Sequence, residues 1–162
     1  MKHIISALVE NKPGVLAQVA GMFAARAFNI DSLVVGRTED PKLSRMTIVV
    51  VGDDRVLEQV RKQLAKVVPV VKVQDFAGEP LVARDLMLIS VSAPPEKRPE
   101  IRSLIEMFKG KVVDLGPKFV MVEVSGPEAK IEAFISACKP YGIKSVARTG
   151  TIAMPRAAKT EP

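Results

Sequence analysis

The sequence predicts an α+β protein made of two successive βαββαβ units. Three observations support this prediction. Short runs rich in β-branched residues alternate with stretches that have apolar residues at three- and four-residue steps, turn residues separate the two kinds of segment, and the same order of elements occurs twice. A βαββαβ chain places two helices on one face of a four-stranded antiparallel sheet, which is the ferredoxin-like arrangement. With 162 residues, the chain is long enough for two such units.

The first unit is expected to cover residues 1–77. Its four strands are predicted over residues 3–9, 28–38, 44–51 and 70–76. The first helix follows the turn at residues 10–14, and its inward apolar side chains are expected to be Leu16, Val19, Ala20, Phe23 and Ala27. The second helix begins after the turn at residues 52–54, which supplies an N-cap, and its inward side chains are expected to be Val56, Val60, Leu64 and Val67.

The second unit is expected over residues 82–152, after a short Gly-Glu-Pro linker at residues 78–81. Its strands are predicted around residues 86–91, 111–115, 118–124 and 143–148. Its two helices are expected to bury Ile101, Leu104, Ile105 and Phe108, and Ile131, Phe134, Ile135 and Cys138. Residues 153–162 are short and polar, and we expect them to form a frayed tail.

Composition excludes several classes of function. The single Cys138 and single His3 rule out an internal disulfide framework and leave too few ligands for a zinc site, which favours a reducing, cytoplasmic location. The net charge of +6 is spread over both halves of the chain and interleaved with acids, and only 4% of residues are aromatic, so no nucleic-acid partner is expected. We also expect no membrane partner, because the sequence has no apolar run of membrane length and no signal peptide.

No arrangement of residues typical of catalysis is present. Cys138 falls on an apolar helix stripe, His3 lies within the first strand, and Gly14 and Gly36 do not form a phosphate-binding loop. Acidic pairs occur only at a helix start and a loop, where carboxylates are favoured for capping and turns. The residues therefore give no support for a catalytic or metal site.

The turn between the first strand and the first helix is the strongest candidate for a binding site. Gly14 has no Cβ to keep a ligand from the backbone, and the amides of Gly14, Val15 and Leu16 would be free to hold an anion at the helix N-terminus. Asn11 would contact the same ligand. Alternatively, Asn11 caps the helix and Gly14 only eases a tight turn, and this stretch alone does not decide between the two.

Four stretches of the first unit carry a family resemblance. They are residues 10–16 (ENKPGVL), 28–33 (FNIDSL), 43–48 (LSRMTI) and 58–64 (EQVRKQL). Their order and spacing resemble the regulatory, or small, subunits of acetolactate synthase, also called acetohydroxyacid synthase. In that family the first unit is an ACT domain, a module that binds effectors in amino-acid metabolism. The resemblance supports the ligand-binding interpretation of the turn over the capping interpretation.

The resemblance implies a regulatory subunit that is not an enzyme. Such subunits bind the catalytic, or large, subunit of acetolactate synthase, activate it and make it sensitive to feedback inhibition by valine, leucine or isoleucine. Thiamine diphosphate, FAD and magnesium would belong to that partner, and this chain would bind no cofactor. The ACT domains would pair in a homodimer. The alternative is an ACT-type amino-acid sensor that regulates a different biosynthetic enzyme.

The resemblance also implies which residues bind the effector. They are Asn11, Gly14 and Val15 from one chain, and Asn29 and Ile30 from the facing chain. Gly36 and Gln59 would be further effector-sensitive positions, although the family usually has Ala where this chain has Gly36. The second unit has the sequence PPEK at residues 94–97 in place of the Asn-x-x-Gly turn, so no second copy of the effector site is expected.

Overall fold

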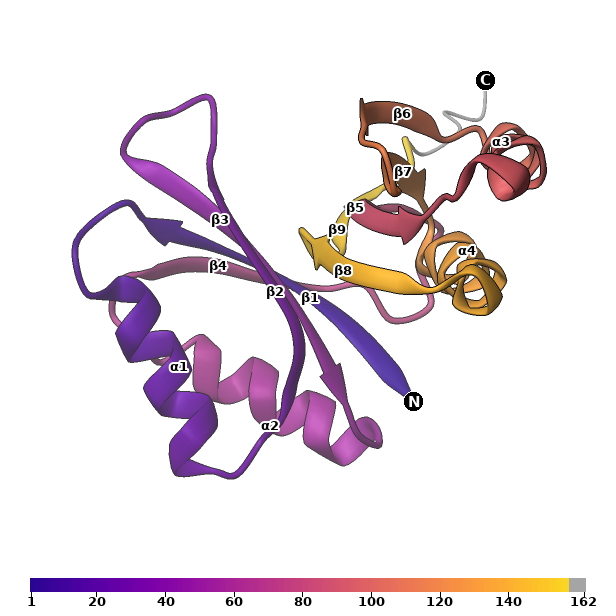
Figure 1. Cartoon of the computed structure of the whole chain (residues 1–162). Coiled ribbons are helices and arrows are strands. Elements are labelled where there is room, and N and C mark those ends of the chain that lie inside the picture. Colours follow the sequence, from indigo (N-terminus) through magenta and orange to yellow (C-terminus); the bar gives the residue numbers. More distant parts are fainter. Residues whose placement is uncertain (158–162) are drawn as a thin grey trace, which may run out of the picture. The chain divides into compact units, whose positions relative to one another are not determined.

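The computed structural model describes residues 1–157, which form two compact units (Figure 1). The first unit comprises residues 1–82 together with the segment that begins at Thr151, and the second comprises residues 83–150. Each unit has the strand and helix order predicted from the sequence. The α+β class with two ferredoxin-like units is therefore confirmed.

The sheet of the first unit has four antiparallel strands in the order β2-β3-β1-β4. The strands are β1 (Lys2–Glu10), β2 (Ile30–Arg37), β3 (Leu43–Val51) and β4 (Val70–Asp75). Two helices, α1 (Val15–Ala25) and α2 (Asp54–Leu64), cover one face of this sheet (Figure 1). Alternate residues of the two central strands fill the core beneath them, with Ile5 opposite Ile48 and Ala7 opposite Met46. The strand β2 forms one edge of the sheet.

The helices of the first unit bury faces slightly different from those expected. Helix α1 buries Val15, Val19, Met22 and Phe23, whereas Leu16 is 48% exposed. The expected stripe through Leu16, Ala20 and Ala27 was wrong, because the helix begins at Val15 and the larger side chains at positions 15, 19, 22 and 23 share one face. In α2, Leu57 joins Val60 and Leu64 in the core. The predicted N-cap is confirmed, since the Oδ1 atom of Asp53 accepts the Val56 N–H at 3.0 Å.

The second unit repeats this topology with its own core. Its main sheet order is β6-β7-β5-β8, built from β5 (Leu81–Ser92), β6 (Lys111–Leu115), β7 (Phe119–Gly126) and β8 (Ile143–Arg148). Helices α3 (Arg98–Met107) and α4 (Glu128–Cys138) cover one face, and the 3₁₀ turns η1 (Pro95–Lys97) and η2 (Lys139–Tyr141) adjoin them (Figure 1). Cys138 is 1% exposed, and burial raises the pKa of its thiol to about 11, so it is a core residue as expected.

The end of the described chain returns to the first unit. Residues Ile152–Pro155 form a strand, β9, that pairs with β5, so the predicted frayed tail was wrong for residues 153–155. Two backbone N–H groups hold the segment at its ends: the Thr151 N–H donates to the Ser32 side-chain Oγ at 3.0 Å, and the Arg156 N–H donates to the Pro80 carbonyl at 2.9 Å. Residues 158–162 of the predicted tail lie outside the described residues.

A charged cluster holds the last strand of the second unit against β5 and α4. The Asp85 side chain is 1% exposed, and its Oδ2 accepts hydrogen bonds from Arg148 Nη2 at 2.6 Å and Nε at 2.9 Å. Arg148 also pairs with Glu132 of α4. Burial lowers the pKa of Arg148, but the hydrogen bonds to Asp85 and Glu132 outweigh it and raise the pKa overall, so the guanidinium stays charged.

We predict that Arg148→Ala destabilises the protein by about 3 kcal/mol, because it leaves the buried Asp85 carboxylate without its cation. The matched control is Arg102→Ala, which removes an exposed pair with Glu106 on α3 and should cost less than about 1 kcal/mol. Urea unfolding followed by circular dichroism would measure both changes in the free energy of unfolding. Equal losses in the two variants would contradict the prediction.

Candidate functional site

The turn between β1 and α1 leaves backbone donors exposed at the start of a helix. Gly14 has φ +85°, in the left-handed region, directly before the first residue of α1. Among the described residues, no acceptor receives the N–H groups of Gly14, Leu16 or Ala17, and the Val15 N–H makes only a 3.5 Å turn contact with the Lys12 carbonyl. The first turn of α1 contains no acidic residue and no side-chain cap. The turn therefore offers several free donors and the positive end of a helix dipole to an anion.

Asn11 is held beside this turn by the loop between β2 and β3. Its backbone N–H donates to the Lys42 carbonyl at 2.8 Å, and its side-chain Nδ2 donates to the Pro41 carbonyl at 3.0 Å. The side chain therefore does not cap α1, which was the alternative interpretation. An open hollow of about 470 Å³ adjoins Asn11, and its lining includes Lys12, Asp40 and Leu43. The contacts with Pro41 and Lys42 were missed from the sequence, because a hydrogen bond across 30 residues has no local pattern.

Asn29 and Ile30 lie at the other end of α1. The helix has 11 residues, so its two ends are about 16 Å apart. Asn29 is exposed, and Ile30 begins the edge strand β2, half-buried against the core. A single chain therefore does not bring Asn29 and Ile30 together with Asn11, Gly14 and Val15.

Gly36 and Gln59 occupy two further surfaces of the first unit. Gly36 lies opposite Arg45, near the end of β2. Since β1 and β2 both pair antiparallel with β3, Gly36 lies at the same end of the sheet as the turn after β1. A Cβ at Gly36 would meet no atom within 4 Å. Gln59 is exposed on α2.

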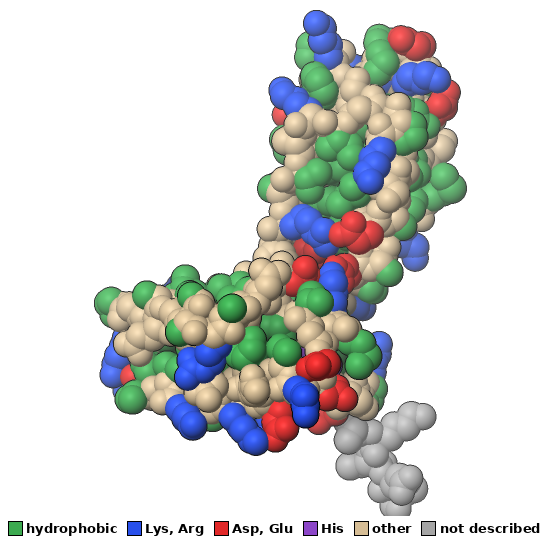
Figure 2. Space-filling view, turned by 90° about the horizontal axis from the view of Figure 1, so that it is seen from below, with side chains coloured by type: hydrophobic (Ala, Val, Ile, Leu, Met, Phe, Trp, Pro, Cys, Tyr) green, Lys and Arg blue, Asp and Glu red, His purple; other side chains and the backbone are tan. Residues whose placement is uncertain are grey.

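His3 has a structural role, and the described residues show no metal cluster or membrane-spanning helix. His3 is 8% exposed on the interior strand β1, and its Nε2 lies 3.1 Å from the Gly52 carbonyl oxygen. Within residues 1–157, no three His, Cys, Asp or Glu side chains gather as metal ligands would. None of the helices in that range is long and apolar enough to cross a membrane. On the face seen in Figure 2, Lys and Arg side chains are scattered among acidic and apolar ones and form no continuous basic stripe.

Comparisons with known proteins identify the family of both units. A family model described as the small subunit of acetolactate synthase matches residues 84–157, and one described as an AHAS small subunit-like ACT domain matches residues 5–72. The chain is 55% identical to the probable acetolactate synthase small subunit of Archaeoglobus fulgidus, over 98% of this chain and 99% of that one. It is 48% identical to the acetolactate synthase small subunit of Aquifex aeolicus, over 96% and 81% of the two chains.

A solved structure extends the agreement to the fold. The acetolactate synthase small subunit of Thermotoga maritima matches with a TM-score of 0.90 at 43% sequence identity, over 97% of this chain and 98% of that one. The identity and the coverage are high enough to show the family as well as the fold. The chain therefore belongs to the family of acetolactate synthase regulatory small subunits, with an ACT domain in its first unit.

Proposed function

We propose that this chain binds the catalytic subunit of acetolactate synthase, activates it and confers feedback inhibition by valine or another branched-chain amino acid. Thiamine diphosphate, FAD and magnesium would reside in the catalytic subunit. The observation that carries the effector site is the set of unpartnered N–H groups at Gly14, Leu16 and Ala17. Family membership supports the choice of partner.

The turn matches the chemistry of an amino-acid effector. The α-carboxylate of the effector would accept hydrogen bonds from the free N–H groups at Gly14, Leu16 and Ala17. Each such charge-assisted hydrogen bond is worth about 1.5 to 3 kcal/mol. The exposed Oδ1 side of Asn11 would accept the α-ammonium, since its Nδ2 is already bonded to Pro41. Leu16, which is 48% exposed beside these donors, would contact the aliphatic side chain.

A second copy of the chain would complete the site. The edge strand β2 is hydrogen-bonded to β3 on one side only, and pairing it with the β2 of a second copy would join the two sheets. If the two β2 strands paired antiparallel about a two-fold axis, Ile30 at the start of one β2 would lie opposite the end of the other β2, where Gly36 is. Asn29 and Ile30 would thus reach the turn of the facing chain. An effector bound there would change how the two chains pack, which the catalytic subunit would sense.

The direct test is acetolactate formation by the cognate catalytic subunit, with and without this chain, over a titration of valine. We expect activation by the chain and inhibition of the activated enzyme by valine. Leucine and isoleucine are tested in parallel, because one methylene changes binding by only about 1 to 3 kcal/mol. No activation would instead favour an ACT-type sensor that regulates a different enzyme.

Replacement of Gly14 by Asp should raise the valine concentration needed for half-inhibition at least about tenfold while activation is kept, because the new carboxylate takes the place of the effector's carboxylate. Gly14→Asn is the matched control, since Asn and Asp have similar size and both tolerate a positive φ better than other residues. A Cβ at this position meets no atom within 4 Å, so both variants should fold. Equal sensitivity of Gly14→Asp and the parent to valine would contradict the site.

A mixed dimer tests whether two chains share the site. A Gly14→Asp chain and an Asn29→Ala chain should each be insensitive to valine when alone. If the two are mixed in equal amounts and exchange freely, half of the dimers are mixed, and each mixed dimer has one intact site. We therefore expect valine sensitivity to return at about one quarter of the sites. If mixing restores nothing although exchange is shown by tagged chains, the site does not combine these residues from facing chains.

A further inference from the structure

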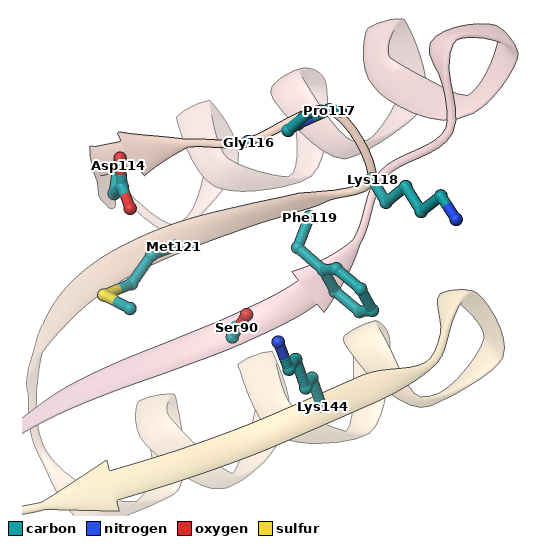
Figure 3. A pocket seen from close by; sticks show the side chains of 8 residues that line it. All are labelled: Ser90, Asp114, Gly116, Pro117, Lys118, Phe119, Met121 and Lys144. Carbon is teal, nitrogen blue, oxygen red and sulfur yellow. The ribbon is translucent and has the colours of Figure 1, made fainter.

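The second unit has a hollow of about 420 Å³ on the open face of its sheet (Figure 3). Its lining residues come from β5, β6, β7, β8 and the hairpin between β6 and β7. They are Ser90, Asp114, Gly116, Pro117, Lys118, Phe119, Met121 and Lys144. Strand register explains why these side chains meet: Met121 lies opposite both Ser90 and Asp114, whereas the alternate residues of β7, Val120 and Val122, face the core.

Ser90 is the polar group at the floor of the hollow. The residue is only 8% exposed, and its hydroxyl has no hydrogen-bond partner among the described residues. Figure 3 shows the Ser90 oxygen and the end of the Lys144 side chain both directed into the hollow that they line. Among the described residues no buried side-chain oxygen lacks a partner, so solvent reaches the Ser90 oxygen, and a ligand in the hollow would replace that solvent as its hydrogen-bond partner.

Lys144 supplies positive charge inside the hollow, whereas Lys118 lies at its rim with its side chain directed outward (Figure 3). The Nζ of Lys144 lies 4.8 Å from the centroid of the Phe119 ring, which holds the ammonium over the aromatic face. Neither Lys144 nor Lys118 forms an ion pair within the described part of the chain. Asp114 is the one carboxylate in the lining, and it lies toward the other end of the hollow in Figure 3.

We propose that this hollow binds a small organic anion. Its carboxylate or phosphate group would be held by Lys144 and the Ser90 hydroxyl, and its apolar part would lie on Phe119 and Met121. The Asp114 carboxylate repels a second negative group at the far end, so the ligand carries its negative charge at one end only. This site is separate from the proposed effector site, which lies in the first unit.

The test is a binding measurement on the full-length, ¹⁵N-labelled chain without the catalytic subunit. Benzoate is the probe, because it combines a carboxylate with a flat apolar ring, whereas acetate and benzyl alcohol each supply one of these groups. We expect benzoate to shift the amide signals around Ser90, Phe119 and Lys144 and to bind about tenfold more tightly than acetate or benzyl alcohol. Shifts confined to the β1–α1 turn would overturn the proposal.

Three variants separate the contributions of the lining residues. Lys144→Gln should weaken benzoate binding about tenfold. Phe119→Leu should make benzoate bind no more tightly than acetate. Lys139→Gln, an exposed lysine of η2 outside the lining, should leave binding unchanged. Equal weakening by Lys144→Gln and Lys139→Gln would overturn the proposal. A second outcome would also overturn the proposal: none of the three probes binds, and Lys144→Gln weakens association of the chain with the catalytic subunit. The hollow would then be a contact surface for that subunit.

Discussion

The left-handed conformation of Gly14 is the constraint on which the candidate effector site depends. This conformation turns the chain from the central strand β1 into α1. Because Gly14 has no side chain, the space next to its backbone stays open. Because β1 is fixed between β3 and β4 and α1 is fixed by its buried face, the free N–H groups have a set direction. The site is thus preorganised by the core, and little ordering is needed when a ligand binds.

The two units share one topology, but the turn that leads into the first helix differs between them. In the first unit, the turn into the first helix ends in Gly14 and leaves its donors free. In the second unit, Pro94 and Pro95 occupy the equivalent place and have no backbone N–H to donate. In the 3₁₀ turn η1, the Lys97 N–H already donates a hydrogen bond to the Pro94 carbonyl. The helix start there has fewer donors to offer. The hollow at Ser90 and Lys144 lies instead on the face of the sheet away from the helices.

The sequence predicted the elements well because their signals are local. The strand β8 was predicted at its observed bounds, and Asp53 marks the start of α2. Contacts between distant segments had no such signal. The bond from Asn11 to Pro41, the pairing of β9 and the hollow around Ser90 each join residues far apart in the chain. Turn chemistry alone singled out Asn11 and Gly14 as candidate site residues, whereas a place for Asn29 beside them requires a second chain.

The return of residues 151–156 to the first unit makes the second unit an insertion within it. A ribosome releases the amino-terminal part of a protein first, and domains usually fold in that order. Here the segment that donates to Ser32 and Pro80 emerges only after all of the second unit. The first unit is therefore completed last, so a nascent chain cannot finish it until the whole second unit has been synthesised.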